Sequence, residues 1–343
     1  MKMIRAVFSL MALTAVCGVA QAPKESLLVL SKHDHTLAIV DPATLKVVAK
    51  MPVGDDPHEV IATADGKMAY VSNYGGGGAG ALHTLAVVDL VNQKALTALD
   101  LGALRGPHGL DFAGGKVWFT AEAAKVFGSV DPESGKVDFV MGTGQNRTHM
   151  IFVTQDLSRI FTTNIQSGTV SIWEKARPNL PSGPPPAAGG PFPPEWNQTL
   201  VQVGAGSEGF DVTSDGKELW SADAQDGSIS VVNIAEKKVV QRIKGNVRGA
   251  NRLKFTPDGK LAFVSTLGGP DVAVFEVATR KEVKRIPVGH GAAGIQMPPD
   301  GSGVFVACTP DNYVAVIDLK TLTVTGHIDA GGNPDGMAWA VQK

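Results

Sequence analysis

The chain has 343 residues, of which 43% are hydrophobic and 19% are charged, a composition typical of a globular protein rather than a disordered or fibrous one. Its formal net charge of −2 gives no general attraction to nucleic acid or to an anionic membrane, so a nucleic-acid partner is not expected. Its 40 glycines and 21 prolines favour many tight turns over long helices.

The first 20 residues have the pattern of a signal peptide. Lys2 and Arg5 precede an apolar run over residues 7–16, which is too short to span a bilayer. Small residues up to Ala20 then offer a cleavage site. Cleavage there removes two basic residues and no acid, so the net charge changes from −2 to −4. We therefore expect a periplasmic or secreted domain over residues 21–343, with no integral membrane segment.

The two cysteines bear on the same expectation. Cys17 leaves a lipoprotein as the alternative, but Val16 stands before it where a small residue is required. After cleavage near Ala20, Cys308 has no partner, so no intramolecular disulfide is expected.

The remaining chain is built from one repeat. An apolar strand is followed by a second, a short polar turn, a third strand, and then a glycine and the opening of the next unit. The strand before the polar turn is clearest at residues 271–277 and 313–319. Tight Asp-Gly turns recur at residues 65–67, 215–217 and 258–260. The runs are rich in Val, Ile, Phe and Trp and too short for helices, which indicates an all-β fold.

Seven equivalent positions open the innermost strands of these repeats. They are His58, His108, His149, Glu208, Asn251, Ala293 and Asp335. Most of their intervals are 41 to 43 residues, the period of a propeller blade. A Gly-rich loop at residues 75–80 lengthens the second unit, and a Pro-rich insertion at residues 177–196 lengthens the fourth.

The ends of the chain are complementary. It begins with three strands, at residues 27–30, 36–40 and 47–53, that lack an inner partner, and it ends with an inner strand at residues 336–340. The sequence therefore predicts a seven-bladed β-propeller with four-stranded blades, closed by the C-terminal strand joining the first N-terminal blade.

The second strand of several repeats carries a signature, Tyr-Val-Ser-Asn at residues 70–73, with variants at residues 161–164, 220–223 and 263–266. Over about residues 27–341 the chain resembles the YVTN-repeat propellers, often called YncE-like proteins. The resemblance implies the fold but little about function, because related propellers include lactonases, a streptogramin lyase and electron-transfer enzymes. The Cys-His haem attachment motif of the last group is absent from this sequence.

The ring of opening positions is the candidate site, because the loops that enter the inner strands of a propeller gather around one mouth of the central channel. Three of the eight histidines, His58, His108 and His149, share this position in adjacent blades. Neutral imidazoles bind zinc or copper, and three can leave a coordination position open for substrate. The alternative is that these side chains line a wet channel and meet only water.

Other polar groups accompany the histidines. Glu208, Asn251 and Asp335 continue the ring, and Arg147 and Arg252 lie next to ring positions, where a guanidinium suits a carboxylate or phosphate. The alternative for the arginines is pairing with acidic residues of the ring.

Two functions remain open on this sequence. The first is an exported propeller that binds a small ligand or a protein partner at its channel mouth. The second is a metal-dependent hydrolase or lyase that uses the histidines, with Glu208 or Glu122 as base. The Pro-rich insertion is either a docking loop or an inert surface insertion.

Overall fold

The computed structural model describes residues 23–176 and 195–343. The predicted signal peptide over residues 1–20 lies outside the described residues, as does the Pro-rich insertion up to residue 194. Within the described part of the chain, no helix is long and apolar enough to cross a membrane. The one short helix that the described residues contain is the 3₁₀ turn η1 (Thr309–Asp311).

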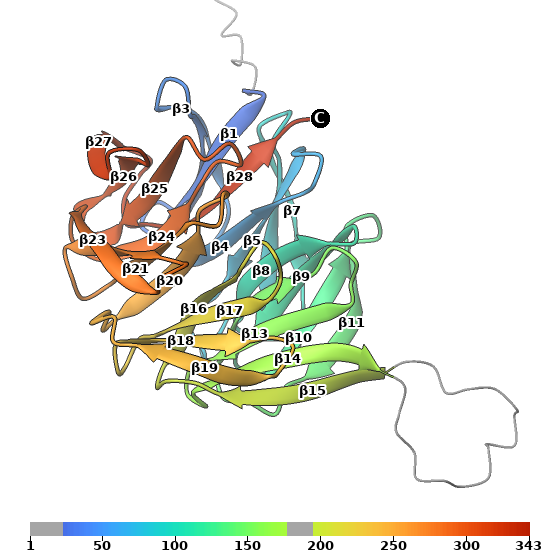
Figure 1. Ribbon diagram of the computed structural model, residues 1–343. Coiled ribbons are helices and arrows are strands. Elements are labelled where there is room, and N and C mark those ends of the chain that lie inside the picture. The colour runs from blue at the N-terminus through green and yellow to red at the C-terminus, as the bar shows by residue number, and fades with distance from the viewer. Residues whose placement is uncertain (1–22, 177–194) are drawn as a thin grey trace, which may run out of the picture.

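The described residues form seven four-stranded antiparallel sheets arranged as the blades of a ring, which confirms the predicted all-β, seven-bladed propeller (Figure 1). The inner strands are β4 (Pro57–Ala62), β8 (Pro107–Ala113), β12 (Thr148–Val153), β16 (Ser207–Val212), β20 (Ala250–Phe255), β24 (Ala292–Gln296) and β28 (Pro334–Val341). The second strands are β5 (Met68–Asn73), β9 (Lys116–Ala121), β13 (Arg159–Asn164), β17 (Glu218–Asp223), β21 (Leu261–Thr266), β25 (Gly303–Cys308) and β1 (Glu25–Ser31). The third strands are β6 (Thr84–Asp89), β10 (Val126–Asp131), β14 (Thr169–Ala176), β18 (Ser228–Asn233), β22 (Asp271–Glu276), β26 (Tyr313–Asp318) and β2 (Thr36–Asp41). The outer strands are β7 (Lys94–Asp100), β11 (Lys136–Gly142), β15 (Glu195–Gln202), β19 (Lys238–Ile243), β23 (Lys281–Pro287), β27 (Thr323–Ile328) and β3 (Lys46–Pro52).

The second and third strands hold the core. In β5 five consecutive residues are buried and in β6 four, because both faces of each blade pack against neighbouring blades. The outer strands are more exposed, and in β11 exposed residues alternate with partly buried ones. The continuous apolar runs in the sequence therefore mark the middle of each blade, and the more polar segments mark its outer edge.

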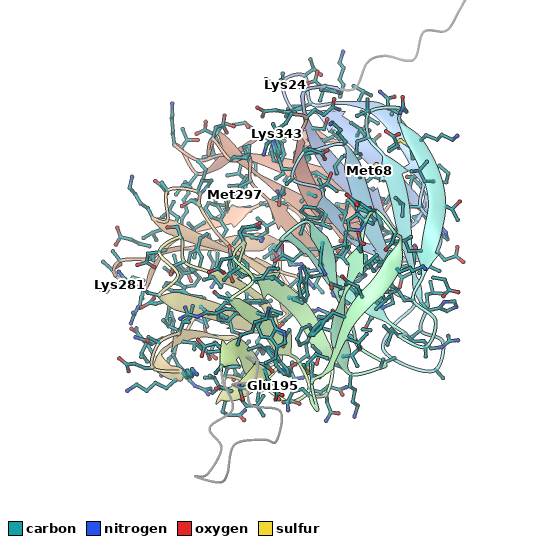
Figure 2. The ribbon with its side chains drawn as sticks, turned by 90° about the vertical axis from the view of Figure 1, so that its right-hand side faces the viewer. Lys24, Met68, Glu195, Lys281, Met297 and Lys343 are labelled. Carbon is teal, nitrogen blue, oxygen red and sulfur yellow. The ribbon has the colours of Figure 1, made fainter. Side chains whose placement is uncertain are left out.

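The first blade contains both ends of the described part of the chain. Its sheet has the order β28-β1-β2-β3, and β28 pairs antiparallel with β1 through Trp339 opposite Leu27 and Ala338 opposite Leu28. The backbone N–H of Gln342 donates to the carbonyl oxygen of Lys24 at 2.8 Å. Lys24 and Lys343 accordingly lie at the same end of the molecule (Figure 2).

Candidate functional site

The predicted ring occupies one structural position, the second residue of every inner strand. Between the first and fourth residues of each of these seven strands, the pairing with the second strand slips by one residue. Such a bulge re-aims the side chains around it. It brings His58, His108 and His149 into one stack, with ring centroids 4.3 Å and 3.6 Å apart.

A hydroxyl of the signature strand fixes this bulge. Thr120 on β9 accepts the backbone N–H of Gly109 and donates to the backbone oxygen of His149 in the next blade. Ser72 on β5 joins the N–H of Glu59 to the oxygen of His108 in the same way. Thr163 and Ser265 repeat the arrangement in their blades. The Ser or Thr of the signature therefore positions ring residues of the following blade.

His108 lies at the centre of the stack and is fully buried. Neither of its ring nitrogens has a hydrogen-bond partner among the described residues. The ring of Tyr74 stands edge-on to it, with centroids 4.9 Å apart. Burial, together with the charge of His149, holds the pKa of His108 well below its usual range, so the imidazole is neutral.

His149 is in a different electrostatic setting. Its Nδ1 contacts Glu122, and its Nε2 lies 3.2 Å from Glu208 Oε1 without good hydrogen-bond alignment. Burial opposes the charge on His149, but Glu208 and Glu122 outweigh it and raise its pKa to about 9. Glu122 also accepts from the hydroxyl of Tyr74 and lies 3.3 Å from Arg147 Nε. A charged imidazole thus lies beside the neutral one.

His58 faces the first blade. Lys32 contacts its Nδ1, and Asp335 Oδ2 lies 3.4 Å from the same atom. Lys32 also pairs with Asp56 at 3.0 Å and with Asp335 at 3.2 Å. Burial and the charge of Lys32 keep the pKa of His58 well below its usual range. Strand β28, near the C-terminus, therefore places Asp335 at the rim of the mouth, beside Lys32 from the N-terminal part of the chain.

Beneath the ring, Glu59 and Arg252 form a buried ion pair across the channel. Asn251 lies beside it: its backbone oxygen accepts from Arg252, and its side-chain nitrogen is 3.4 Å from Glu208. On the far side of the pair, all seven inner strands line a cavity of about 220 Å³. The ion pair therefore separates this cavity from the histidine stack.

The room for that pair comes from glycines at the third position of other inner strands. A Cβ at Gly209 would lie 2.5 Å from the Cα of Arg252, and one at Gly336 would lie 3.0 Å from the Cα of Glu59. Each large residue thus has a glycine beside it in the preceding blade. At the rim, Gly77 of the Gly-rich loop similarly lies against Glu122, where a Cβ would be 2.8 Å from the carboxylate.

The structure therefore brings together all eight of the predicted site residues. His58, His108, His149, Glu208 and Asn251 meet at the mouth, as do Arg147, Arg252 and Asp335. The sequence reasoning missed Lys32, Asp56, Glu59 and Tyr74. A signal for Glu59 was present, because the residue after each ring position is glycine in four blades and large in three, namely Glu59, Met150 and Arg252.

One combination of these side chains has the spacing of metal ligands. In the described residues, one ligand atom from each of His58, Glu59 and His108 lies within 4.8 Å of the others. The predicted ligand set of His58, His108 and His149 is not the one found: Glu59 takes the third place, and His149 instead contacts Glu122 and Glu208.

The fold and the polar mouth place the protein among seven-bladed β-propellers with a histidine-rich channel entrance. No family model matches the chain. Over 152 residues it is 28% identical to Antigen Lp49 of Leptospira interrogans serogroup Icterohaemorrhagiae serovar copenhageni (strain Fiocruz L1-130), which involves 38% of this chain and 33% of that protein. The chain thus matches about a third of the length of this curated relative.

Solved structures share the fold over most of the chain. A protein of unknown function from Desulfotomaculum acetoxidans DSM 771 aligns with a TM-score of 0.72 and 14% identity, over 93% of this chain and 99% of that one. A candidate 6-phosphogluconolactonase from Bacteroides fragilis NCTC 9343 aligns with a TM-score of 0.69 and 16% identity, over 92% and 98%. Kuenenia stuttgartiensis hydrazine synthase aligns with a TM-score of 0.64 and 15% identity, over 82% and 89%. At these identities the similarity shows the propeller fold alone.

Proposed function

We propose that the channel mouth binds a small hydroxylated anion, such as a sugar acid or a sugar phosphate. The observation that carries the proposal is His108, a fully buried imidazole with no partner at either nitrogen. An unsatisfied buried polar group costs about 1–3 kcal/mol, and a ligand or ordered water at the mouth would recover that energy.

The rim supports an anion in particular. Lys32 and Arg147 border the stack, and 25% and 37% of their side chains are exposed, so both are partly accessible to a ligand. Glu208 and Asp56 are partly exposed acceptors that suit ligand hydroxyls. The candidate 6-phosphogluconolactonase among the fold neighbours makes phosphorylated sugar acids the first class to test.

The test is calorimetric titration with 6-phosphogluconate, gluconate and glucose 6-phosphate. Arg147→Ala should weaken binding by about tenfold or more, because one charge-assisted hydrogen bond is lost. The matched control is Arg242→Ala on the outer strand β19, which should leave affinity unchanged. If none of these anions binds at millimolar concentration, or if both variants behave alike, the proposal fails.

A second candidate function is hydrolysis of a sugar lactone, the class named for one of the fold neighbours. The observation that favours it is the charged His149 beside the partly exposed Glu208. Glu208 would take a proton from water as the water adds to the lactone carbonyl. His149 would stabilise the resulting oxyanion, and the proton held by Glu208 would pass to the ring oxygen as the ring C–O bond breaks, which yields the hydroxy acid.

The assay is proton release from 6-phosphogluconolactone and δ-gluconolactone, corrected for spontaneous opening. Glu208→Gln and His149→Gln should each abolish the excess rate, whereas His290→Ala, a change at an exposed surface histidine, should not. Equal rates with and without the wild-type protein would exclude this activity.

We also propose that the protein is exported and related to the YVTN-repeat propellers. The charged start, the short apolar run and the small residues near Ala20 support export, and the signature strands support the relationship. Mass spectrometry of the mature N-terminus tests export. An uncleaved Met1, or a lipid on Cys17, would contradict a freely soluble periplasmic product.

A further inference from the structure

The mouth is rich in charged and metal-ligating side chains. Its carboxylates are Asp56, Glu59, Glu122, Glu208 and Asp335, and its cationic side chains are Lys32, Arg147, His149 and Arg252. His58 and His108 add two imidazoles, and neither ring nitrogen of His108 has a hydrogen-bond partner among the described residues. A carboxylate and two imidazoles within 4.8 Å of one another form a donor set that suits a divalent cation.

We propose that His58, Glu59 and His108 bind a first-row divalent transition metal, with zinc as the best-suited ion. The inference deepens the proposed function, because it places a cation at the floor of the same mouth. Three protein ligands would leave one tetrahedral position directed toward the rim, where a ligand oxygen could bind.

The donor set selects this class of metal. Two imidazoles and one carboxylate suit zinc and its neighbours, whereas magnesium and calcium prefer oxygen ligands throughout. The three ligand atoms lie within 4.8 Å of one another, and tetrahedral zinc needs separations of about 3.3 Å. Binding therefore requires the ligand atoms to draw together by at most about 1.5 Å, a change that rotamer adjustment can supply.

The surroundings hold two of the ligands in place. Ser72 clamps the backbone of Glu59 in its own blade to that of His108 in the next. The inner strands thus present the donors on rigid backbone.

Arg252 is the present counter-ion of Glu59 and competes with a metal. Its guanidinium contacts Glu59 Oε1, which leaves Oε2 as the second donor atom of that carboxylate. Arg252 is itself almost fully buried, so separating its guanidinium from Glu59 would cost free energy by leaving a buried charge unpaired. A metal at this position would take over part of its role in neutralising Glu59.

The experiment uses protein produced without a histidine tag and stripped with a chelator. Cobalt(II) is the spectroscopic probe, and zinc is titrated in competition. Wild-type protein should bind one equivalent, with the visible absorption of tetrahedral cobalt, and zinc should raise its melting temperature. Magnesium and calcium should do neither.

Variants test the assignment of the ligands. His58→Ala, His108→Ala and the isosteric Glu59→Gln should each weaken binding by more than about 100-fold. His290→Ala, which removes an exposed histidine paired with Asp311, is the matched control and should bind like wild type. Circular dichroism of each variant separates loss of metal from loss of fold.

Arg252→Gln gives an opposite and more specific outcome. Removing the competing cation should tighten zinc binding by about tenfold and make the melting temperature depend more steeply on zinc than in wild type. Weaker binding in this variant would show that Arg252 does not compete for Glu59 and would overturn that step.

The metal-site proposal and the anion-site proposal can be tested separately. If wild-type protein shows no tetrahedral cobalt spectrum and no zinc-dependent shift, the metal assignment is wrong, whatever the anion titrations show. If metal binds at His58, Glu59 and His108 but the anions do not, only the proposed function fails.

Discussion

Adjacent histidines at the mouth have pKa values shifted in opposite directions. Burial lowers the pKa of His58 and His108, whereas Glu208 and Glu122 overcome burial and raise that of His149 to about 9. Stacked rings only 3.6 Å apart thus carry different charges at neutral pH. The neutral pair can serve as ligands or acceptors, and the charged ring can stabilise an anion.

His149 should make stability fall in alkali. Its folded pKa of about 9 lies above the ordinary histidine value of 6.5, so the stability that it contributes is complete below about pH 6.5 and is lost as pH rises through 9. A shift of this size corresponds to about 3 kcal/mol. Urea unfolding between pH 6 and 10 should show a smaller decline in His149→Gln than in wild type. Equal slopes would contradict the charged assignment.

Asp223 should produce a pH effect at lower pH. Burial raises its pKa to about 6 although Ser230, Ser221 and Ser228 donate to it. Because this folded pKa exceeds the ordinary aspartate value of 3.8, the stability that Asp223 contributes is present below about pH 3.8 and is lost as pH rises through 6, by about 3 kcal/mol.

Asp223→Asn should therefore gain stability relative to wild type between pH 4 and pH 7.5. Asparagine already occupies this strand position in two other blades, as Asn73 and Asn164. Denaturation at both pH values measures the change. Asp226→Asn is the contrasting variant, since hydrogen bonds from Ser228 outweigh burial and lower the pKa of Asp226. It should lose stability at neutral pH, and a gain there would contradict the argument.

At the scale of the strand, the signature hydroxyl links one blade to the next. Thr120 connects the bulge of β8 to the backbone of His149 on β12, so a strand with no side chain in the mouth still shapes it. The sequence predicts the repeat position of His149 correctly, because blade spacing alone sets it. It does not show this link, because the two hydrogen-bonded backbone groups belong to different blades.

Thr120→Val should destabilise the protein by about 1–3 kcal/mol, because it leaves a buried N–H and a buried carbonyl without a partner. Thr120→Ser should restore most of the loss. Thr162→Val is the matched control: its hydroxyl is buried on the next signature strand and has no partner among the described residues. That substitution should be neutral or stabilising in urea unfolding. Equal costs at the two positions would refute the clamp.

At the scale of the whole molecule, the ring could be predicted and the contents of the channel could not. Repeat spacing locates the seven second positions of the inner strands, and all seven predictions hold. The pairing of Glu59 with Arg252 joins residues 193 positions apart in blades on opposite sides of the channel. No local pattern encodes such a contact, since it depends on the diameter of the closed ring and on glycines at the same level.

Ring closure connects this architecture to the site. Strand β28 pairs along most of β1, buries Met337, Ala338 and Ala340, and places Asp335 beside Lys32 at the mouth. Removing it would leave the edge of β1 unpaired and open a gap between the first blade and its neighbours.

Deletion of residues 334–343 should therefore abolish cooperative unfolding of the whole propeller, rather than lower stability only locally. The truncated protein should bind a dye for exposed hydrophobic surface and should lose the single melting transition. A synthetic peptide of residues 334–343 should restore that transition when added in excess, because β28 is held by backbone pairing and buried side chains rather than by its covalent connection. A scrambled peptide of the same composition is the control. If the truncated protein melted like the full-length chain, or if both peptides acted alike, the β1–β28 pairing would not be what holds the ring together.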